Sequence, residues 1–368
     1  MDKKLVLLFS IIAFVACCVE GLGWWDFKGQ WAINVYLLHG VDPYLRYTAE
    51  EIKSLNLPII PEGWGTSPWG MVLGQVFYAG WLPLATAKIY FLLLHIVAYL
   101  GVVLYCVKKF PKQKIHIILL ALSALCWYIR PINSGNAGAL LALLLLFSII
   151  CYKKHVIVAA LCLALAMIKP QLALLFCIFF LIKKQFLLLT IAATVDVIAW
   201  GITCVVLNVD PLTILKEFLG CNIGESGSYY GIATLFVDKN LVMPISMSVG
   251  VVFSLIGYYI HKSDDELLQI IPFSVATSFW AYSWGNEMLI LIPFAIWFYE
   301  RFVRTAWHVK WFYLSSFLYL VMGRLIITAV KHALIPIVEN KALVLAITLY
   351  MVGLIVLMPW KRVYAFEE

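Results

Sequence analysis

Asp26 is the acidic residue best placed to do chemistry. It stands in the aromatic run Gly23-Trp24-Trp25-Asp26-Phe27-Lys28, only a few residues after the first hydrophobic stretch. A carboxylate just outside a membrane stays ionised while it faces the lipid boundary. It can then accept a proton from a hydroxyl nucleophile whose partner is held in lipid, which is general-base chemistry. The alternative is an interfacial acid among tryptophans that mark a membrane boundary.

Lys169 is the basic residue whose position most suggests a bound anion. It lies in Lys169-Pro170-Gln171, a tight corner between two apolar stretches. A lysine at membrane depth is costly unless it meets an anion or a carboxylate. An anionic lipid headgroup would satisfy it, and so would an internal pair with Asp26 or Glu287. Other cations that could bind a phosphate, or simply extend to the membrane surface, are Arg130, Arg324 and His332.

Two turns carry further polar residues. Gly40-Val41-Asp42-Pro43-Tyr44 is a turn signal in which the Asp42 side chain can bond nearby backbone amides, and this structural role is favoured. Asn136 follows Arg130 in an outward turn and precedes an apolar helix. Its side chain can cap that helix, and the backbone amides of the same helix start would face outward.

The elements that position these residues must be membrane helices. Hydrophobic residues make up 64% of the 368 residues and charged residues only 13%. No soluble fold could bury so much apolar surface, and the apolar stretches are continuous rather than alternating. We therefore expect an all-α polytopic membrane protein. About twelve spans are predicted, near residues 5–22, 85–107, 115–130, 137–152, 155–169, 170–182, 186–207, 241–260, 267–282, 287–300, 311–330 and 341–359.

The lysines and arginines orient these spans. With the N-terminus in the cytoplasm, most of them fall in cytoplasmic loops, as the positive-inside rule requires. Both termini are then cytoplasmic, and the chain forms one domain, 1–368, in the plasma membrane. Its long outer loops are about 23–84 and 208–240. The first would hold a short amphipathic helix near Gln30–His39 and an interfacial or re-entrant helix at Trp69–Leu82.

Several functional classes lack their sequence signals. The chain has no nucleotide-binding loop, no dinucleotide fingerprint, no HExxH and no paired CxxC. We therefore expect no cofactor and no metal, and there is no basic run with interleaved aromatics for nucleic acid. An enzyme of this kind must take a donor that is already activated and lipid-linked.

Four stretches resemble glycosyltransferase family 87, a group of polyprenyl-phosphate-mannose-dependent mannosyltransferases in the GT-C superfamily. They are Asp26-Phe27 with Tyr36-Leu37-Leu38-His39-Gly40-Val41-Asp42-Pro43-Tyr44; Thr66-Ser67-Pro68-Trp69; Ser134-Gly135-Asn136-Ala137-Gly138 with Met167-Ile168-Lys169-Pro170-Gln171; and Ser278-Phe279-Trp280-Ala281-Tyr282 with Leu291-Ile292-Pro293. Two departures stand out. Ser134 and Gly135 occupy the place of a glutamine in the family's turn, and Tyr282 or Trp284 occupies the zone of a histidine.

The resemblance implies an inverting membrane glycosyltransferase with a GT-C-like bundle. It would move a hexose, mannose by family precedent, from a polyprenyl-phosphate donor to a lipid-linked or cell-envelope glycan acceptor on the outer side. Asp26 would be the catalytic base. The donor phosphate would meet Lys169, Arg130, Arg324 and His332. The substrate-binding residues would be Asp42, Tyr44, Asn136, Gln171, Tyr282 and Glu287.

Two other functions remain open from the residues. A transporter or flippase of lipid-linked saccharides would use Asp196 and Arg324 as charges within the membrane, although the chain lacks the repeat symmetry of many transporters. A membrane acyltransferase would need a deep histidine, and His95 is the candidate. His95 more simply bonds a backbone carbonyl. The identities of the sugar, the acceptor and the lipid chain are not encoded in any motif.

Overall fold

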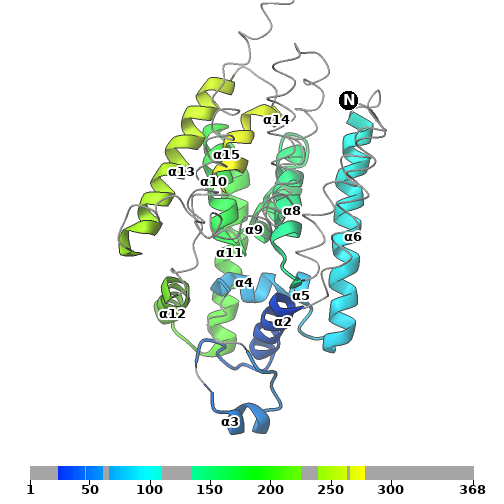
Figure 1. Cartoon of the computed structure of the whole chain (residues 1–368), viewed down its shortest axis with the longest axis vertical. Coiled ribbons are helices and arrows are strands. Elements are labelled where there is room, and N and C mark those ends of the chain that lie inside the picture. Colours follow the sequence, from blue (N-terminus) through cyan, green and yellow to red (C-terminus); the bar gives the residue numbers. More distant parts are fainter. Residues whose placement is uncertain are drawn as a thin grey trace, which may run out of the picture. The chain divides into compact units, whose positions relative to one another are not determined.

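Helices are the regular elements of the described chain. The computed structural model describes residues 24–45, 47–60, 66–109, 134–224, 239–262 and 266–277, and no strand occurs in these ranges. The chain divides into two compact units. One comprises residues 20–105 and 128–228, and the other comprises residues 1–19, 106–127 and 229–368. The all-α prediction is confirmed for the described residues (Figure 1).

Two described helices are long and apolar enough to cross a membrane. They are α6 (Leu84–Lys109), whose apolar window is Leu84–Tyr105, and α11 (Phe186–Leu207). Both match predicted spans, and both expose large apolar side chains such as Val97 and Val205, as lipid contact requires. The predicted spans 5–22, 115–130, 287–300, 311–330 and 341–359 lie outside the described residues. A bundle of twelve spans is therefore not confirmed.

Three further apolar helices in the unit that contains residues 128–228 are shorter. They are α8 (Gly138–Cys151), α9 (Val156–Ala166) and α10 (Pro170–Ile182), with 14, 11 and 13 residues. At about 1.5 Å per residue they are roughly 16–21 Å long, less than the ~30 Å of a bilayer core. The predicted segments 137–152, 155–169 and 170–182 are thus confirmed as helices, but each is short for a complete span.

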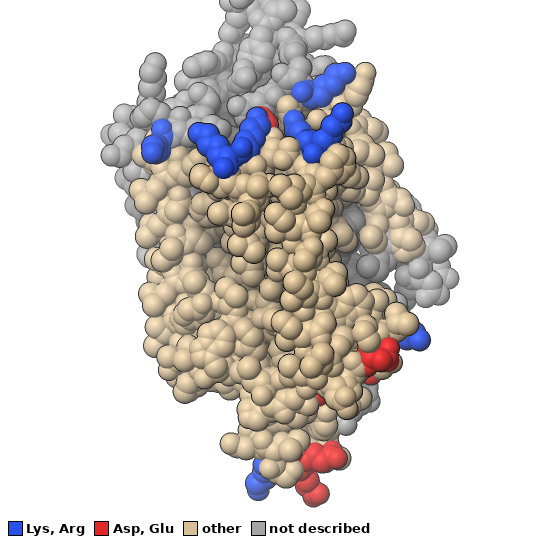
Figure 2. All heavy atoms as spheres, turned by 180° about the vertical axis from the view of Figure 1, so that it is seen from behind, with Lys and Arg blue, Asp and Glu red and all other residues tan. Residues whose placement is uncertain are grey.

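Helices α8 to α11 pack together and reverse direction at tight turns. Helix α9 packs against α8 and α11, and α10 contacts all three. The turns 152–155 and 183–185 therefore lie at one end of this group, and the segments 134–137, 167–169 and 208–210 lie at the other. The first end carries the lysine pairs Lys153-Lys154 and Lys183-Lys184. On the face shown in Figure 2, basic side chains gather at one edge of a broad surface without charged side chains, and the positive-inside rule predicts such a separation.

The predicted first outer loop contains four short helices. They are α2 (Trp25–Leu38), α3 (Ala49–Ser54), α4 (Pro68–Leu73) and α5 (Gln75–Tyr78). Helix α2 begins earlier than the expected helix near Gln30–His39, and the expected helix at Trp69–Leu82 is two helices. Helix α5 ends at Ala79, which adopts a left-handed conformation (φ 44°). Gly80 lies so close to the Asn34 backbone that a side chain there would collide with it.

Local signals explain where these helices start. Thr48 and Glu51 form a reciprocal capping box on α3. Ser67 caps α4 through Gly70 N–H, and Pro68 takes the first position, where its missing N–H costs nothing. Asp210 caps α12 (Pro211–Gly224) by accepting from Leu212 N–H at 2.9 Å.

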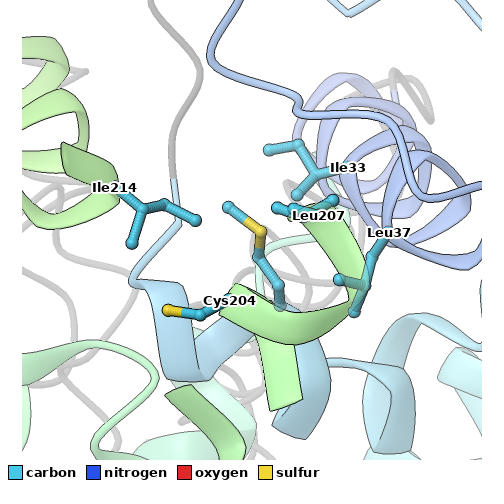
Figure 3. Packing of buried hydrophobic residues seen from close by; sticks show 6 residues of the cluster. Ile33, Leu37, Cys204, Leu207 and Ile214 are labelled. Atoms are coloured by element: carbon cyan, nitrogen blue, oxygen red, sulfur yellow. The ribbon is translucent and has the colours of Figure 1, made fainter. Parts of the chain in front are cut away.

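One buried apolar cluster joins the loop helices to α11. It consists of Ile33, Leu37, Met71, Cys204, Leu207 and Ile214, from α2, α4, α11 and α12 (Figure 3). These side chains are at most 8% exposed. The loop helices are therefore packed onto the end of α11 by burial of apolar surface, which stabilises their positions.

The other unit contains α13 (Lys239–His261), α14 (Glu266–Gln269) and α15 (Ile271–Ala276). Helix α13 packs against both short helices. It matches the predicted span 241–260 and accommodates Pro244 near its start.

Candidate active site

Three helices begin at the same place in the larger described unit. Asp26 lies in the first turn of α2, Asn136 lies two residues before α8, and Lys169 is the residue that precedes α10. The start of a helix carries free N–H groups and a partial positive charge. Each helix contributes one polar side chain to this point, so a carboxylate, an amide and an ammonium meet where three positive helix ends converge.

The three side chains form a continuous hydrogen-bonded chain. Asn136 Nδ2 donates to Asp26 Oδ2 at 2.9 Å, and Lys169 Nζ donates to Asn136 Oδ1 at 2.6 Å. These three residues were proposed from the sequence as base, substrate-binding group and phosphate-binding group. The structure brings all three together, with the amide between the two charged groups.

The backbone around Asn136 holds its side chain in place. Gly138 N–H donates to Asn136 Oδ1 at 2.8 Å, which fixes which end of the amide faces Asp26. Ala137 N–H donates to the Tyr78 hydroxyl at 3.3 Å. Gly135 has φ +76° and lies directly against Phe27, where a Cβ would collide with both the side chain and the backbone. Only glycine fits both conditions, so this turn can approach Asp26 closely.

Aromatic side chains surround the start of α2. Phe27 is fully buried and contacts the rings of Trp24, Tyr78 and Phe91, with centroids 5.0–5.7 Å away. Tyr78 stacks on Phe91 with centroids 5.7 Å apart. Burial raises the pKa of Tyr78, and the Asp26 charge adds to that rise. The Tyr78 hydroxyl therefore stays protonated beside the site.

The corner that carries Lys169 is clamped by the Thr66–Gly70 segment. Ser67 Oγ donates to Ile168 O at 3.1 Å, and Trp69 Nε1 donates to Met167 O at 2.7 Å. Thr203 of α11 donates to Pro68 O at 2.7 Å and so ties the clamp to the long helix. These bonds satisfy carbonyls that the end of α9 leaves without a helical partner. They fix the direction in which Lys169 leaves the corner.

Asp42 and Tyr44 lie beyond the opposite end of α2. Asp42 is 5% exposed and accepts from Tyr44 N–H at 2.9 Å, while the Tyr44 hydroxyl bonds Thr66 O. Burial raises the pKa of Asp42, although the Tyr44 amide opposes this. Burial and the nearby Asp42 also raise the pKa of Glu217 on α12. The structure thus places Asp42 and Tyr44 apart from Asp26, in a turn next to a second acid.

The remaining candidates are placed as follows. Gln171 is the second residue of α10 and so lies next to the Lys169 corner. Asp196 lies within α11. His95 lies in α6, fully buried, with Nδ1 2.9 Å from Phe91 O, which fits the role of bonding a backbone carbonyl. The candidates that fall outside the described residues are Arg130, Arg324, His332, Tyr282 and Glu287.

Two supporting residues were missed in the sequence. Tyr78 lies in a segment read only as an apolar interfacial helix, and no local pattern marks a hydroxyl that will meet a turn 59 residues later. Gly135 was noted as a departure from the family pattern, whereas its left-handed φ shows a steric role. In the ranges that the structure describes, no three His, Cys, Asp or Glu side chains gather as a metal site would require.

Comparison with known families identifies the class of protein to which this site belongs. The model of glycosyltransferase family 87 matches residues 68–260, which is more than half of the chain, and the protein belongs to that family. The matched region includes Asn136 and Lys169, and Asp26 is linked to it by its bond to Asn136. No curated protein sequence and no solved structure matches the chain. The protein is therefore a glycosyltransferase with membrane-type helices.

Proposed function

We propose that this protein is an inverting glycosyltransferase that uses a polyprenyl-phosphate sugar. It transfers a hexose, most simply mannose as in the resembling mannosyltransferases, to a lipid-linked or cell-envelope glycan acceptor. The observation that carries the proposal is the Asp26–Asn136–Lys169 chain. It places a carboxylate and a cation on either side of one amide, and a glycosyl transfer from a phosphate donor needs one of each.

Asp26 serves as the general base. The acceptor hydroxyl gives its proton to the free carboxylate oxygen of Asp26 as its oxygen attacks the anomeric carbon. A new glycosidic C–O bond forms, the C–O bond to the phosphate breaks, and the configuration at that carbon inverts. General-base assistance of this kind contributes about 10²- to 10⁴-fold to a rate. Oδ2 is held by Asn136, which leaves Oδ1 to face the acceptor.

Lys169 and the start of α10 stabilise the leaving group. As polyprenyl phosphate departs, its negative charge grows, and fixed positive charge lowers the barrier. Helix α10 begins without a side-chain cap, and Pro170 occupies its first position. The positive end of the α10 dipole and the Lys169 ammonium therefore lie in the same region. Gln171 would contact the sugar or phosphate at the same helix start.

The depth of the site suits a lipid-linked donor. Helix α10 ends and helix α11 begins at the turn 183–185, so Lys169 is roughly level with residue 200, short of the far end of α11. The bond of Trp69 to Met167 and its ring contact with Trp200, at 6.4 Å, agree with that level. A headgroup phosphate entering from the outer leaflet of the plasma membrane would meet Lys169 without leaving the lipid boundary. Both chain termini are then cytoplasmic.

Transfer assays with defined donors test the proposal. Purified protein is given a panel of radiolabelled polyprenyl-phosphate sugars with total membrane lipid and glycan as acceptors. Asp26→Asn is assayed in parallel. Glu50→Gln is the matched control, because it neutralises an exposed acid of the same loop on α3. We expect transfer from one donor, lost in Asp26→Asn and kept in Glu50→Gln.

Each other outcome has a distinct meaning. Near-normal transfer by Asp26→Asn removes this residue as the base. Absence of transfer from every donor by folded protein contradicts the enzyme proposal and favours a transporter of lipid-linked saccharides, in which Asp196 becomes the next residue to test.

A further inference from the structure

We infer that Asn136 is a positioning residue that keeps the Asp26 carboxylate and the Lys169 ammonium apart, so that one remains a base and the other an anion-binding group. The inference rests on the proposed function for its chemical meaning. It assigns Asn136 a role different from substrate contact, because both ends of its amide are already engaged by the protein.

The bonding pattern shows why an amide is needed. Asn136 offers a donor to the carboxylate and an acceptor to the ammonium in one planar group. Its Oδ1 also accepts from Gly138 N–H, which prevents the amide from turning over. An aspartate at this position would keep the bonds to Lys169 and Gly138 but would face Asp26 with a second carboxylate. An alanine would remove both bonds.

Without the amide, the two charged groups would be free to bind each other. A carboxylate that pairs directly with an ammonium is a weaker base, because the ion pair favours its ionised form. The ammonium in turn becomes less available to a phosphate. An intervening neutral amide lets each group bond to Asn136 instead of to the other.

Other titratable groups around Asp26 do not provide this separation. Tyr78 of α5 lies close enough for the Asp26 charge to act on it, but it stays protonated. Lys88 of α6 lies over the Trp24 ring at 5.4 Å, and Lys28 follows Asp26 on α2. None of these three groups is bonded to Asn136 in the described structure, whereas Asn136 joins Lys169 to the Asp26 carboxylate.

The test measures the protonation of Asp26 directly and does not depend on turnover. A hydrophobic carbodiimide labels protonated carboxyl groups, and the label on the peptide that contains Asp26 is quantified by mass spectrometry across a pH series. Asp26→Asn identifies the signal from this carboxyl. Ser148→Ala is the structural control, because it removes a buried hydrogen bond from α8 to Ala159 O and touches neither charged group.

Two variants should move the labelling curve in opposite directions. In Asn136→Asp two carboxylates face each other, so we expect the midpoint of Asp26 labelling to rise by about one pH unit or more. In Asn136→Ala we expect the midpoint to fall as Asp26 pairs with Lys169. Ser148→Ala should leave it unchanged. A general loss of packing cannot produce shifts of opposite sign.

Transfer activity gives a second readout. In Asn136→Asp the acidic limb of the rate–pH profile should move in the same direction as the labelling midpoint, with activity partly recovered at higher pH. Unchanged labelling midpoints in both Asn136→Asp and Asn136→Ala overturn the positioning role. A midpoint shift in Ser148→Ala as large as the shifts in the Asn136 variants overturns it as well. If the native protein transfers sugar from no donor, the proposed function fails, yet the labelling result still decides the role of Asn136.

Discussion

The two ends of α2 carry carboxylic acids in contrasting surroundings. At the first turn, Asp26 accepts from the Asn136 amide N–H, and the oxygen of the same amide accepts from Lys169. Beyond the last turn, roughly 20 Å away along the helix, Asp42 is buried near another acid, Glu217. The same kind of side chain is therefore set up for two tasks. In the proposed reaction one end presents an oxygen to the acceptor, and the other end lies in a turn near Glu217 of α12.

The comparison shows what separates a candidate base from a structural acid. Asp26 accepts a hydrogen bond from the Asn136 amide, and that amide in turn is bonded to Lys169. Asp42, in contrast, is buried and lies near Glu217. Burial raises the pKa of both Asp42 and Glu217. These surroundings favour a structural role for Asp42 over contact with substrate, as its turn motif predicts.

The largest expected effect comes from exchanging the two acids for amides one at a time. Asp26→Asn should lower transfer by about 10²- to 10⁴-fold, because the base is lost. Asp42→Asn keeps an oxygen for Tyr44 N–H and should change transfer far less. Initial rates with the preferred donor measure both. Equal losses in the two variants would erase the distinction and return Asp42 to the substrate site.

Removal of the cation should have the next largest effect. Lys169→Met keeps the length of the side chain but removes the charge, and we expect a loss of about 10²-fold, mainly through weaker use of the donor. Lys154→Met, at the other end of the helix group, is the control. Rates measured against donor concentration separate the two effects. A donor dependence that matches the native protein would mean that Lys169 has a structural role.

A change at Gly135 tests the steric requirement on the Asp26 side. Gly135→Ala should destabilise the protein by about 1–2 kcal/mol through the left-handed backbone alone, and the collision with Phe27 adds to this. The turn must shift, so transfer should fall as well. The thermal unfolding midpoint in detergent reports the first effect. A variant with native stability and rate would show that this turn can move freely.

The smallest effect is expected at the Asp42 end. Because the pKa of Glu217 is raised in the folded state, the folded protein holds its proton more tightly, and stability falls as pH rises through and above the usual carboxyl range. Glu217→Gln removes that charge and should make the unfolding midpoint less sensitive to pH. The change is small because Glu217 is partly exposed and screened. A steeper pH dependence in the variant would contradict this reading.

Much of the architecture could be predicted from local sequence. Continuous apolar stretches gave α6 and α11 nearly to the residue, and Lys169-Pro170 correctly marked a corner because proline favours the first turn of a helix. The positions of α8 to α10 also followed from their flanking turns, although α9 is shorter than the predicted segment 155–169. That each is a complete span is not confirmed, since apolar composition does not distinguish a short packed helix from one that crosses the bilayer.

The site was only partly predictable because its contacts are distant in sequence. Asp26, Asn136 and Lys169 could be proposed one by one, but their hydrogen bonds join residues 110 and 33 positions apart. No periodicity encodes such pairings. The contact of Tyr78 with Ala137 could not be predicted for the same reason. The turn at Asp42 could be predicted from local sequence, but its proximity to Glu217 of α12 could not.

The clamp on the Lys169 corner has a consequence for how the protein is made. Thr203 bonds a carbonyl 135 residues earlier in the chain. At about 5–20 residues per second, on the order of ten seconds or more of synthesis separates the two halves of that contact. Asp26 and Lys169 must therefore pass through membrane insertion before the framework that orients them is complete. A translational pause or a slowed insertion step between these segments should lower the yield of active protein without any change in its sequence.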